Sequence, residues 1–250
     1  MSAVAVNHAV VSQEEWLGAR KAFLAEEKKL TRLRDELSRK RRELPWVRVE
    51  KNYVFDGPNG KETLSDLFDG RSQLVVYHFM FGPGWGAGCS RCSMGADHFN
   101  PSVIHLAQRD VTLIAVSRAP FAEIDAFKRP MGWGFHWVSS YGSDFNYDYR
   151  VSFSPEEMAN GRFDYNYGLN GFPTDEATGT SVFYKDSENN VFHTYSSYAR
   201  AAEGMLIPYH FLDIVPKGRD EEDFLPDAMA WVRYHDSYRD LRQGVVQLVE

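Results

Sequence analysis

The chain is poor in cysteine and has no long run of apolar residues. Only two of its 250 residues, Cys89 and Cys92, are cysteines, so a framework of disulfide bonds cannot hold the fold together. The longest strongly apolar stretch, residues 74–81, is much shorter than the roughly 20 residues that a membrane-spanning helix needs. We therefore expect a globular protein with neither a disulfide scaffold nor a membrane span.

Basic charge is also scarce. The sequence has 28 lysine and arginine residues against 35 aspartate and glutamate residues, which gives a formal net charge of -7. A chain with this charge has no general positive field, so we expect neither nucleic acid nor an anionic membrane surface as a partner. The first residues contain neither the basic segment nor the long apolar segment of a secretory signal, and this predicts a cytoplasmic protein.

Residues 12–43 have the pattern of one long helix. Ser12 is a suitable N-cap, acidic residues follow it, four basic residues end the segment, and Pro45 stops it. Large apolar residues recur at intervals of seven and form one narrow stripe: Trp16, Phe23, Leu30, Leu37 and Leu44. A helix of this length reaches about 45 Å, more than a compact domain covers. We therefore predict an N-terminal helical arm, residues 1–44, through which the protein forms a homodimer or a larger assembly.

The segments that follow alternate between strands and helices. Residues 47–55, 74–81 and 111–116 are expected to be strands, because apolar and β-branched residues are gathered there between turn signals. Amphipathic helices are expected at residues 92–108 and 120–128. This order predicts parallel strands that are joined by a crossover helix.

A hairpin and a last helix complete the predicted domain. Residues 181–184 and 191–195 flank a polar turn and are expected to pair as strands, and residues 222–241 are expected to form an amphipathic helix. Parallel strands followed by a hairpin match the strand order of a thioredoxin fold. We predict an α/β protein with a thioredoxin-like fold. A central mixed sheet flanked by helices occupies residues 45–220, and a C-terminal helix in residues 221–250 packs on the same domain.

The two cysteines lie where a glycine-rich loop, residues 82–88, meets the start of a predicted helix. Unpaired backbone N–H groups and the helix dipole stabilise negative charge there, and Arg91 adds a cation, so we expect a low pKa for the Cys89 thiol. Cys92 lies one turn inside the helix. Cysteines at this spacing can close a disulfide, so Cys89 is the expected nucleophile and Cys92 the resolving thiol in exchange with a protein or small-thiol substrate. This redox-active disulfide needs no further cofactor.

Two other interpretations of the cysteines stay open at the level of the sequence. The thiols could be buried and packed as small apolar groups without any chemistry. They could instead bind zinc or copper together with His78 in the preceding strand and His98 in the helix, although no second Cys-x-x-Cys pair supports such a site. Measurements of free thiols and of bound metal distinguish these alternatives.

Other polar and aromatic residues are candidates for positions near the cysteine pair. Trp85 precedes Cys89 by four residues and could shield the disulfide, and Asp97 could assist proton transfer. Residues of the predicted hairpin could face the pair from the sheet, namely His193, Tyr195 and Tyr198. The sequence contains no phosphate-binding loop, HExxH motif or GxSxG motif that would point to another chemistry.

Four ordered segments carry a resemblance to a known family. They are GPGWGAGCSRCSMGADHFN, MGWGFHWVSSYGSDFNYDY, SVFYKDSENNVFHTYSSYARAAEG and FLDIVPKGRDE. With the long helix before them, they resemble a bacterial family of thioredoxin-like proteins of uncharacterised function, over about residues 12–240. Its members are described as predicted dithiol-disulfide oxidoreductases, or are likened to alkyl hydroperoxide reductase and thiol-specific antioxidant proteins. The resemblance implies a thioredoxin-like fold and thiol redox activity, with Cys89 as the nucleophile and Cys92 as its resolving partner.

Two departures from related families bear on the site. Thioredoxins have a cis-proline before the strand that faces the active site, whereas this chain has Gly179 and Thr180 there, and we expect these two residues beside the cysteine pair. Peroxiredoxins have a proline and a threonine shortly before the reactive cysteine, and the segment GWGAGC has neither. The second departure weakens an interpretation as a peroxidase.

Overall fold

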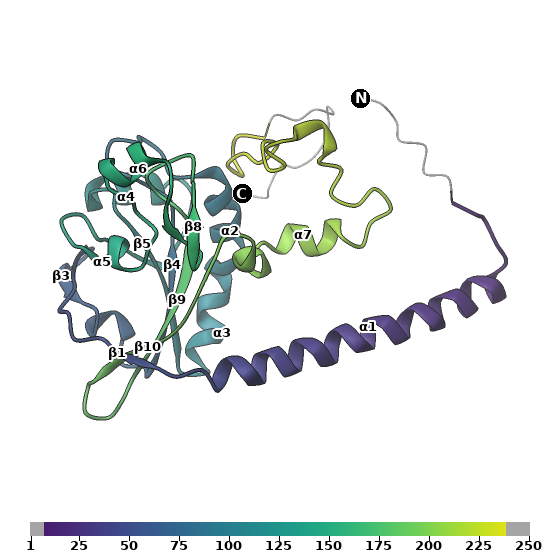
Figure 1. Cartoon of the computed structure of the whole chain (residues 1–250), viewed down its shortest axis with the longest axis horizontal. Coiled ribbons are helices and arrows are strands. Elements are labelled where there is room, and N and C mark those ends of the chain that lie inside the picture. The colour runs from purple at the N-terminus through teal and green to yellow at the C-terminus, as the bar shows by residue number, and fades with distance from the viewer. Residues whose placement is uncertain (1–7, 239–250) are drawn as a thin grey trace.

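The computed structural model describes residues 8–238, and an eight-stranded mixed sheet with helices on both faces forms its centre (Figure 1). The strands of this sheet are β1 (Val47–Arg48), β2 (Val54–Gly57), β3 (Gly60–Thr63), β4 (Gln73–His78), β5 (Val111–Ser117), β6 (His136–Ser139), β9 (Gly179–Lys185) and β10 (Val191–Tyr198). Their order across the sheet is β1-β10-β9-β4-β5-β6-β2-β3. A separate antiparallel pair consists of β7 (Phe163–Tyr165) and β8 (Gly168–Asn170).

The helices connect and cover these strands. The α-helices are α1 (Gln13–Arg42), α2 (Ser90–Phe99), α3 (Val103–Ala107), α4 (Phe121–Lys128), α5 (Phe145–Asp148), α6 (Pro155–Asn160) and α7 (Ile207–Leu212). The short 3-10 helices are η1 (Asp66–Phe68), η2 (Asn100–Ser102), η3 (Ala199–Met205) and η4 (Glu222–Phe224). Within the described part of the chain, no helix combines the length and the apolar character that crossing a membrane requires.

The central strands have the order and directions of a thioredoxin-like fold. β4 is parallel to β5, β5 is parallel to β6, and α2 and α3 connect β4 to β5. On the other side of β4, β9 lies antiparallel to it, and β10 lies antiparallel to β9. A strand, helix, strand unit followed by a hairpin is the arrangement that the sequence predicts. The predicted fold class is therefore confirmed.

Alternate residues of β4 pack into two separate cores on the two faces of the sheet. Tyr77, and Phe79 just after the strand, belong to one core, which contains residues from α2 and α4. Leu74 and Val76 belong to the other, which contains residues from α5. The His78 ring lies against aromatic rings of this second core. Because successive strand residues point to opposite faces, the neighbours Tyr77 and His78 face different sides of the sheet.

The segment predicted as one strand over residues 47–55 forms two strands at opposite sides of the sheet. β1 pairs with β10, whereas β2 pairs with β3 and β6. Between them Tyr53 packs into the second core, and the exposed Lys51 forms ion pairs with Asp144 and Asp148 at 2.7 Å. The prediction of a single strand is wrong, because an apolar pattern indicates extended chain but does not identify the neighbour with which that chain pairs.

The C-terminal helix predicted over residues 222–241 is also wrong in its described part. Residues 222–224 form η4, and turns and bends follow as far as residue 238, while residues 239–250 lie outside the described residues. Pro226 has no backbone N–H to donate and restricts the residue before it, so it interrupts a helix at this point. The predicted division of the chain into three parts stays a prediction.

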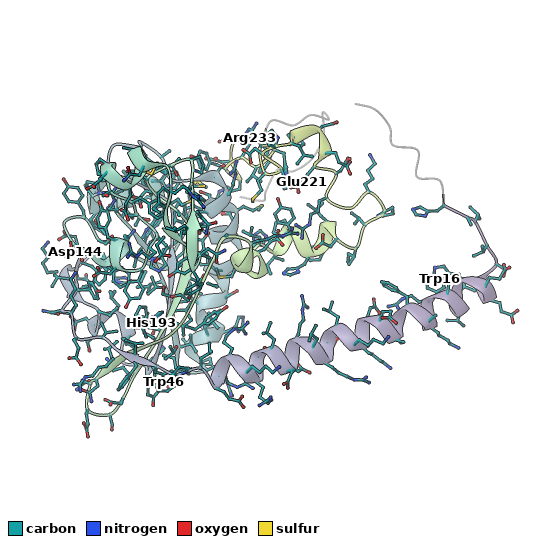
Figure 2. The ribbon with its side chains drawn as sticks, in the orientation of Figure 1. Trp16, Trp46, Asp144, His193, Glu221 and Arg233 are labelled. Atoms are coloured by element: carbon teal, nitrogen blue, oxygen red, sulfur yellow. The ribbon has the colours of Figure 1, made fainter. Side chains whose placement is uncertain are left out.

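Helix α1 extends away from the rest of the molecule (Figure 1). At its start Ser12 and Glu15 form a capping box, in which Ser12 Oγ accepts from the Glu15 N–H at 3.2 Å and the Glu15 carboxylate accepts from the Ser12 N–H at 2.9 Å. No residue of α1 is buried, and its apolar stripe is exposed from Trp16 onward (Figure 2). At the other end, the Arg41 guanidinium lies 4.9 Å from the Tyr195 ring centre. An assembly through this stripe stays a prediction.

Candidate functional site

Cys89 lies at the junction between the loop after β4 and the first turn of α2. It is the N-cap residue of α2, and its backbone N–H donates to the Met80 carbonyl at 2.9 Å. The residue before it must be a glycine, because a Cβ at Gly88 would lie 2.6 Å from the Phe79 ring and 2.8 Å from the Phe127 ring. Close packing against two aromatic rings thus fixes the end of the loop, and with it the position of the Cys89 sulfur.

The two thiols have opposite electrostatic environments. A hydrogen bond from the Cys92 side chain is the main cause that lowers the pKa of Cys89 to about 6. The N–H groups of Cys92 and Arg91 and the Arg91 charge act in the same direction, and burial opposes them. Burial raises the pKa of Cys92 well above its ordinary value, and the neighbouring Cys89 raises it further. At pH 7 Cys89 is therefore a thiolate, while Cys92 keeps its proton.

A buried tyrosine that the sequence did not single out lies beside the Cys92 thiol. Tyr77 is only 4% exposed and its hydroxyl is hydrogen-bonded with Cys92. The Thr178 hydroxyl lies 3.3 Å from Tyr77 Oη and 3.2 Å from the His78 carbonyl oxygen. It has a single hydrogen, and when it donates this hydrogen to Tyr77 Oη, the tyrosine O–H stays available to Cys92. Burial raises the pKa of Tyr77, and its hydroxyl stays protonated. In the sequence Tyr77 is one of several aromatic residues in an apolar strand, so no spacing identifies it.

Both cysteines line a cavity of about 600 Å³, which we name the cysteine cavity. Its walls include seven aromatic and thioether side chains besides Tyr77, namely Met80, Trp85, Tyr165, Phe172, Met205, Met229 and Tyr234. Charged groups come from Arg91, Arg200 and Glu203. The volume and the apolar walls are typical of a site for a small molecule, for which cavities measure roughly 300–1,000 Å³.

A C-terminal strap, residues 225–238, closes one side of this cavity. It bonds to three residues that flank Cys89. Tyr234 Oη donates to the Gly88 carbonyl at 2.6 Å, and Ser90 Oγ donates to the Val232 carbonyl at 3.3 Å. Arg91 forms an ion pair with Asp227. Tyr234 also packs edge-on against the Phe127 ring, at 5.6 Å between centres. The strap therefore restricts access to the Cys89 sulfur from that side.

Two of the residues predicted around the pair, Trp85 and Arg91, line the cysteine cavity. Trp85 packs against the core beneath the cysteines, and the Arg91 charge stabilises the more acidic thiol. Asp97 does not line this cavity. Its carboxylate accepts from Trp133 Nε1 at 2.8 Å and lies 2.7 Å from His235 Nδ1, so it anchors the strap rather than serving the thiols.

The start of β9 approaches the cysteines one residue earlier than the sequence suggests. Thr178, not Gly179 or Thr180, lines the cysteine cavity. Gly179 packs on Tyr198, whose ring would lie 2.6 Å from a Cβ at this position. The Thr180 hydroxyl points toward Met205 Sδ at 4.0 Å, so Thr180 contacts a wall residue of the cavity without reaching the cavity itself.

The metal site considered from the sequence is not assembled. His78 Nε2 lies 2.8 Å from Ser181 Oγ, and the His78 ring stacks on Tyr149, on the face of β4 opposite the cysteines. His98 Nδ1 lies 2.6 Å from the Met94 carbonyl oxygen. The part of the chain that the structure describes contains no group of three or more His, Cys, Asp or Glu residues that could hold a metal ion. The alternative with these two histidines as ligands is therefore wrong.

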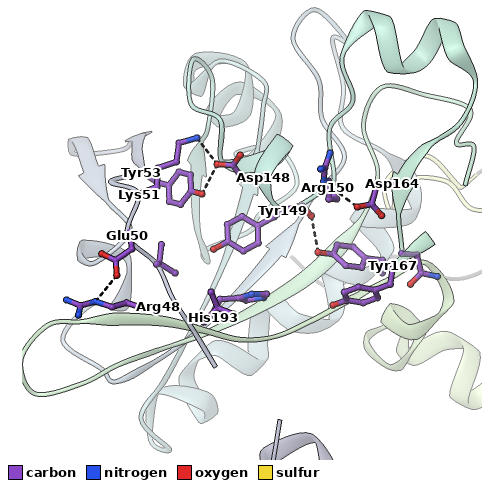
Figure 3. A pocket seen from close by; sticks show the side chains of 14 residues that line it. Arg48, Glu50, Lys51, Tyr53, Asp148, Tyr149, Arg150, Asp164, Tyr167 and His193 are labelled. Carbon is purple, nitrogen blue, oxygen red and sulfur yellow. Dashed lines mark hydrogen bonds and ion pairs between the residues drawn. The ribbon is translucent and has the colours of Figure 1, made fainter. Parts of the chain in front are cut away.

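A second cavity, of about 510 Å³, lies on the other face of the sheet (Figure 3). His193 and Tyr198, which the sequence suggested as neighbours of the cysteines, line this cavity instead, so that prediction is wrong for both residues. Three further tyrosines line it, Tyr53, Tyr149 and Tyr167. We name it the tyrosine cavity.

Comparisons with known proteins give a family and distant structural similarities. The model of a bacterial family of proteins of unknown function, DUF899, matches residues 5–238. No match was found among the curated proteins. A PrxQ mutant from Xylella fastidiosa has 17% sequence identity and a TM-score of 0.41, with 66% of this chain and 94% of that chain covered.

Two other solved structures are similar to the same degree. The peroxidoxin BcpB from Mycobacterium tuberculosis has 15% identity and a TM-score of 0.40, with 66% of this chain and 94% of that chain covered. A peroxiredoxin Q from Xanthomonas campestris has 15% identity and a TM-score of 0.42, with 62% and 87% covered. Similarity at this level identifies neither an activity nor a substrate for this chain.

Proposed function

The chain belongs to the bacterial DUF899 family of proteins of unknown function, and we propose that its Cys89–Cys92 pair is a dithiol that exchanges disulfide bonds with a small thiol or disulfide compound. The contrast in acidity between the two neighbouring thiols carries this proposal. The pKa of Cys89 is about 6, whereas that of Cys92 is raised well above its ordinary value. One stable thiolate beside one protected thiol suits attack on a disulfide followed by resolution.

The exchange takes place in two steps. The Cys89 thiolate attacks one sulfur of an external disulfide, a new S–S bond forms to that sulfur, and the other half leaves as a thiolate that is protonated by water. Cys92 then loses its proton and attacks the Cys89 sulfur. This step releases the second half of the substrate as a thiol and leaves the Cys89–Cys92 disulfide. An external thiol reductant returns the pair to the dithiol form, so the cycle uses no further cofactor.

Tyr77 assists the second step as a positioning residue. A thiolate at Cys92 has little water around it, and burial makes its formation costly. The Tyr77 hydroxyl, which burial keeps protonated, can donate a hydrogen bond to this thiolate. Thr178 holds the hydroxyl in place through its own hydrogen bond at 3.3 Å. The two residues therefore lower the barrier to resolution without contacting the substrate.

The backbone beside the cysteine cavity favours a small substrate over a peptide. An extended peptide docks most readily where a strand has free N–H and C=O groups. Just before β9 these groups are already paired, by the bonds Ala177 N–H to Val151 O at 2.8 Å, Phe153 N–H to Asp175 O at 2.9 Å, and Tyr165 Oη–H to Thr178 O at 2.9 Å. A substrate then reaches Cys89 through the cysteine cavity, whose walls suit a compact, largely apolar molecule.

Trapping of the intermediate tests the proposal. With bis(2-hydroxyethyl) disulfide as the probe, Cys92→Ser should accumulate a mixed disulfide through Cys89, which mass spectrometry of the intact protein detects. Cys89→Ser should trap none, and the unmodified protein should end as the internal disulfide. Iodoacetamide near neutral pH should modify Cys89 before Cys92, because the thiolate is the nucleophile. The double variant Cys89→Ser, Cys92→Ser supplies the background.

The outcome also decides between parts of the proposal. If both single variants trap equally, or if neither thiol reacts near neutral pH, the dithiol mechanism is wrong. If the mechanism holds but insulin disulfides react faster than the small probe, each measured relative to free cysteine under the same conditions, only the small-substrate part fails.

A further inference from the structure

We propose that the tyrosine cavity is a second binding site, which takes a small neutral aromatic compound carrying a hydrogen-bond donor. It lies on the face of the sheet opposite the cysteines, and no step of the proposed exchange uses it. Its volume of about 510 Å³ falls within the roughly 300–1,000 Å³ of small-molecule sites. Three features of its lining define the ligand.

The walls of the cavity are aromatic and come from distant parts of the chain. Tyr53 precedes β2, Tyr149 follows α5, Tyr167 lies in the turn between β7 and β8, and His193 and Tyr198 lie on β10 (Figure 3). Aromatic walls make edge-to-face and offset contacts with a flat ring, in addition to removing its apolar surface from water. The lining therefore favours an aromatic ligand.

The charged side chains of the lining cancel one another. Each has a partner of opposite sign within the same lining: Arg48 with Glu50 at 3.3 Å, Lys51 with Asp148 at 2.7 Å, and Arg150 with Asp164 at 3.7 Å (Figure 3). An ionic ligand would have to break one of these pairs or stay without a counter-charge in a partly enclosed space. The cavity therefore favours a neutral ligand.

His193 presents an acceptor to the ligand. Its Nε2 lies 3.1 Å from the Tyr195 carbonyl oxygen and 2.7 Å from Ser196 Oγ. A carbonyl oxygen only accepts, so Nε2 carries the hydrogen, and burial lowers the pKa of His193, which keeps the ring neutral near pH 7. Nδ1 then has a lone pair, and among the described residues no group donates to it. A ligand with an O–H or N–H donor can bond to this lone pair.

A chain of hydrogen bonds behind the cavity is compatible with this tautomer. Ser196 Oγ lies 2.8 Å from Ser181 Oγ, which lies 2.8 Å from His78 Nε2. With the His193 N–H donating to Ser196, each serine donates to the next group, and the chain ends on the His78 lone pair. His78 Nδ1 is buried and has no partner within the described chain. The relay orients His193 but leaves its outer nitrogen available to a ligand.

The hairpin of β7 and β8 supplies one wall of the cavity. Asn166 and Tyr167 are the two residues of its turn, because Tyr165 pairs with Gly168. Their φ of 54° and 61° are the left-handed values that a two-residue hairpin turn requires. The turn thus brings the Tyr167 ring to the cavity.

Binding of 4-methylphenol to the full chain tests the inference, with nuclear magnetic resonance as the readout. Its ring matches the tyrosine walls and its hydroxyl can donate to His193 Nδ1. We expect saturable shifts of the resonances of His193, Tyr149 and Tyr167. The methyl ether of this phenol lacks the donor and should bind about tenfold more weakly, which is the effect of one hydrogen bond. Benzoate and benzylamine should bind more weakly still because they are charged.

Variants locate the site. His193→Ala should remove the preference for the phenol over its ether. Tyr167→Leu should weaken binding of both, and it keeps the inference testable if the histidine variant does not fold. Tyr141→Leu is the matched control, because Tyr141 is 55% exposed and lines neither named cavity. The inference is overturned by the absence of saturable shifts, by shifts at the cysteine cavity alone, by equal affinity for phenol and ether, or by binding that neither variant weakens.

Discussion

The two faces of the sheet carry cavities of similar volume and different chemistry. The cysteine cavity contains a thiolate that one loop and one helix start create, and its walls are apolar. The tyrosine cavity contains no cysteine and draws its polar groups from four separate segments. Adjacent residues of β4 serve the two faces, because Tyr77 bonds with the resolving thiol and His78 ends the serine relay. An acidic thiol can thus arise from local spacing, whereas a cavity depends on how distant segments pack.

Replacement of the Cys89 sulfur by oxygen should distinguish the two faces of the sheet most strongly. Cys89→Ser should reduce disulfide exchange by roughly 10³-fold or more, because a serine hydroxyl is not ionised near neutral pH. The same variant should bind 4-methylphenol like the unmodified protein. His193→Ala should do the reverse, with normal exchange and altered binding. Stopped-flow measurement of exchange and titration of the phenol check both, and coupled losses in either variant would show that the cavities are not independent.

The pH dependence of thiol modification should show the next largest effect. The lowered pKa of Cys89 means that its thiolate is present above about pH 6 and is lost as the pH falls through that value. The alkylation rate should therefore rise between pH 5 and 7 and level off, at about 90% ionisation by pH 7, against about 3% for an ordinary cysteine. Initial rates with iodoacetamide, compared with those of the urea-unfolded chain, give the curve. A midpoint near the ordinary value would contradict the electrostatic account of the site.

The sequence predicts those parts of the fold that local patterns determine. The apolar runs of β4 and β5, with a helix between them, identify a parallel unit, and the polar turn before β10 identifies the hairpin. β6 was missed, because its four residues, HWVS, lie within an aromatic-rich segment that has no clear periodicity. The path of residues 49–53 across the second core was also missed. Along this path Tyr53 is buried in the second core, where its ring packs against Phe145 and Tyr149, residues far along the chain.

The candidate site shows the same difference between features that local sequence determines and features that depend on distant segments. Trp85 and Arg91 lie within four residues of a cysteine, and the sequence places both at the cavity correctly. Tyr77, Thr178 and the strap are distant in sequence, so only the folded structure shows that they meet the thiols. The sequence leaves His78 open as a metal ligand beside the cysteines although it is next to Tyr77, because a strand pattern does not reveal toward which face the following loop turns.

Tyr77→Phe should give a smaller effect that is confined to the cysteine face. Loss of one hydrogen bond to a charged group, worth about 1.5–3 kcal/mol, should slow the resolving step by roughly tenfold or more. Alkylation of Cys89 should be nearly unchanged. Thr178→Val should slow resolution less, and Thr180→Val is the matched control, because Thr180 lies outside the cavity. Decay of the mixed disulfide after rapid mixing measures the step, and an unchanged rate in Tyr77→Phe would remove this residue from the mechanism.

Helix α1 belongs to neither face, and its charges suggest how a second copy would cover its apolar stripe. Its first turn is acidic and its last turn is basic. Two antiparallel copies would place these ends against each other. In the same arrangement Trp16 faces Leu44 of the second copy, Phe23 faces Leu37, and Leu30 faces its own counterpart, because the stripe repeats every seven residues. A two-fold interface of this kind is isologous, so one surface serves both copies.

A substitution in the apolar stripe of α1 should therefore have the smallest effect on the two cavities. The unmodified protein should be a homodimer at micromolar concentration. Phe23→Glu should make it a monomer, because the new carboxylate would be buried against the apolar stripe of the second copy. Lys21→Glu changes charge on the same helix outside the stripe and is the control that should leave the dimer intact. Disulfide exchange and phenol binding should stay within about twofold of the original values in both variants, since α1 lines neither named cavity. Light scattering gives the mass. A monomeric unmodified protein would exclude the dimer, and a large loss of exchange in monomeric Phe23→Glu would show that the second copy contributes to the cysteine site.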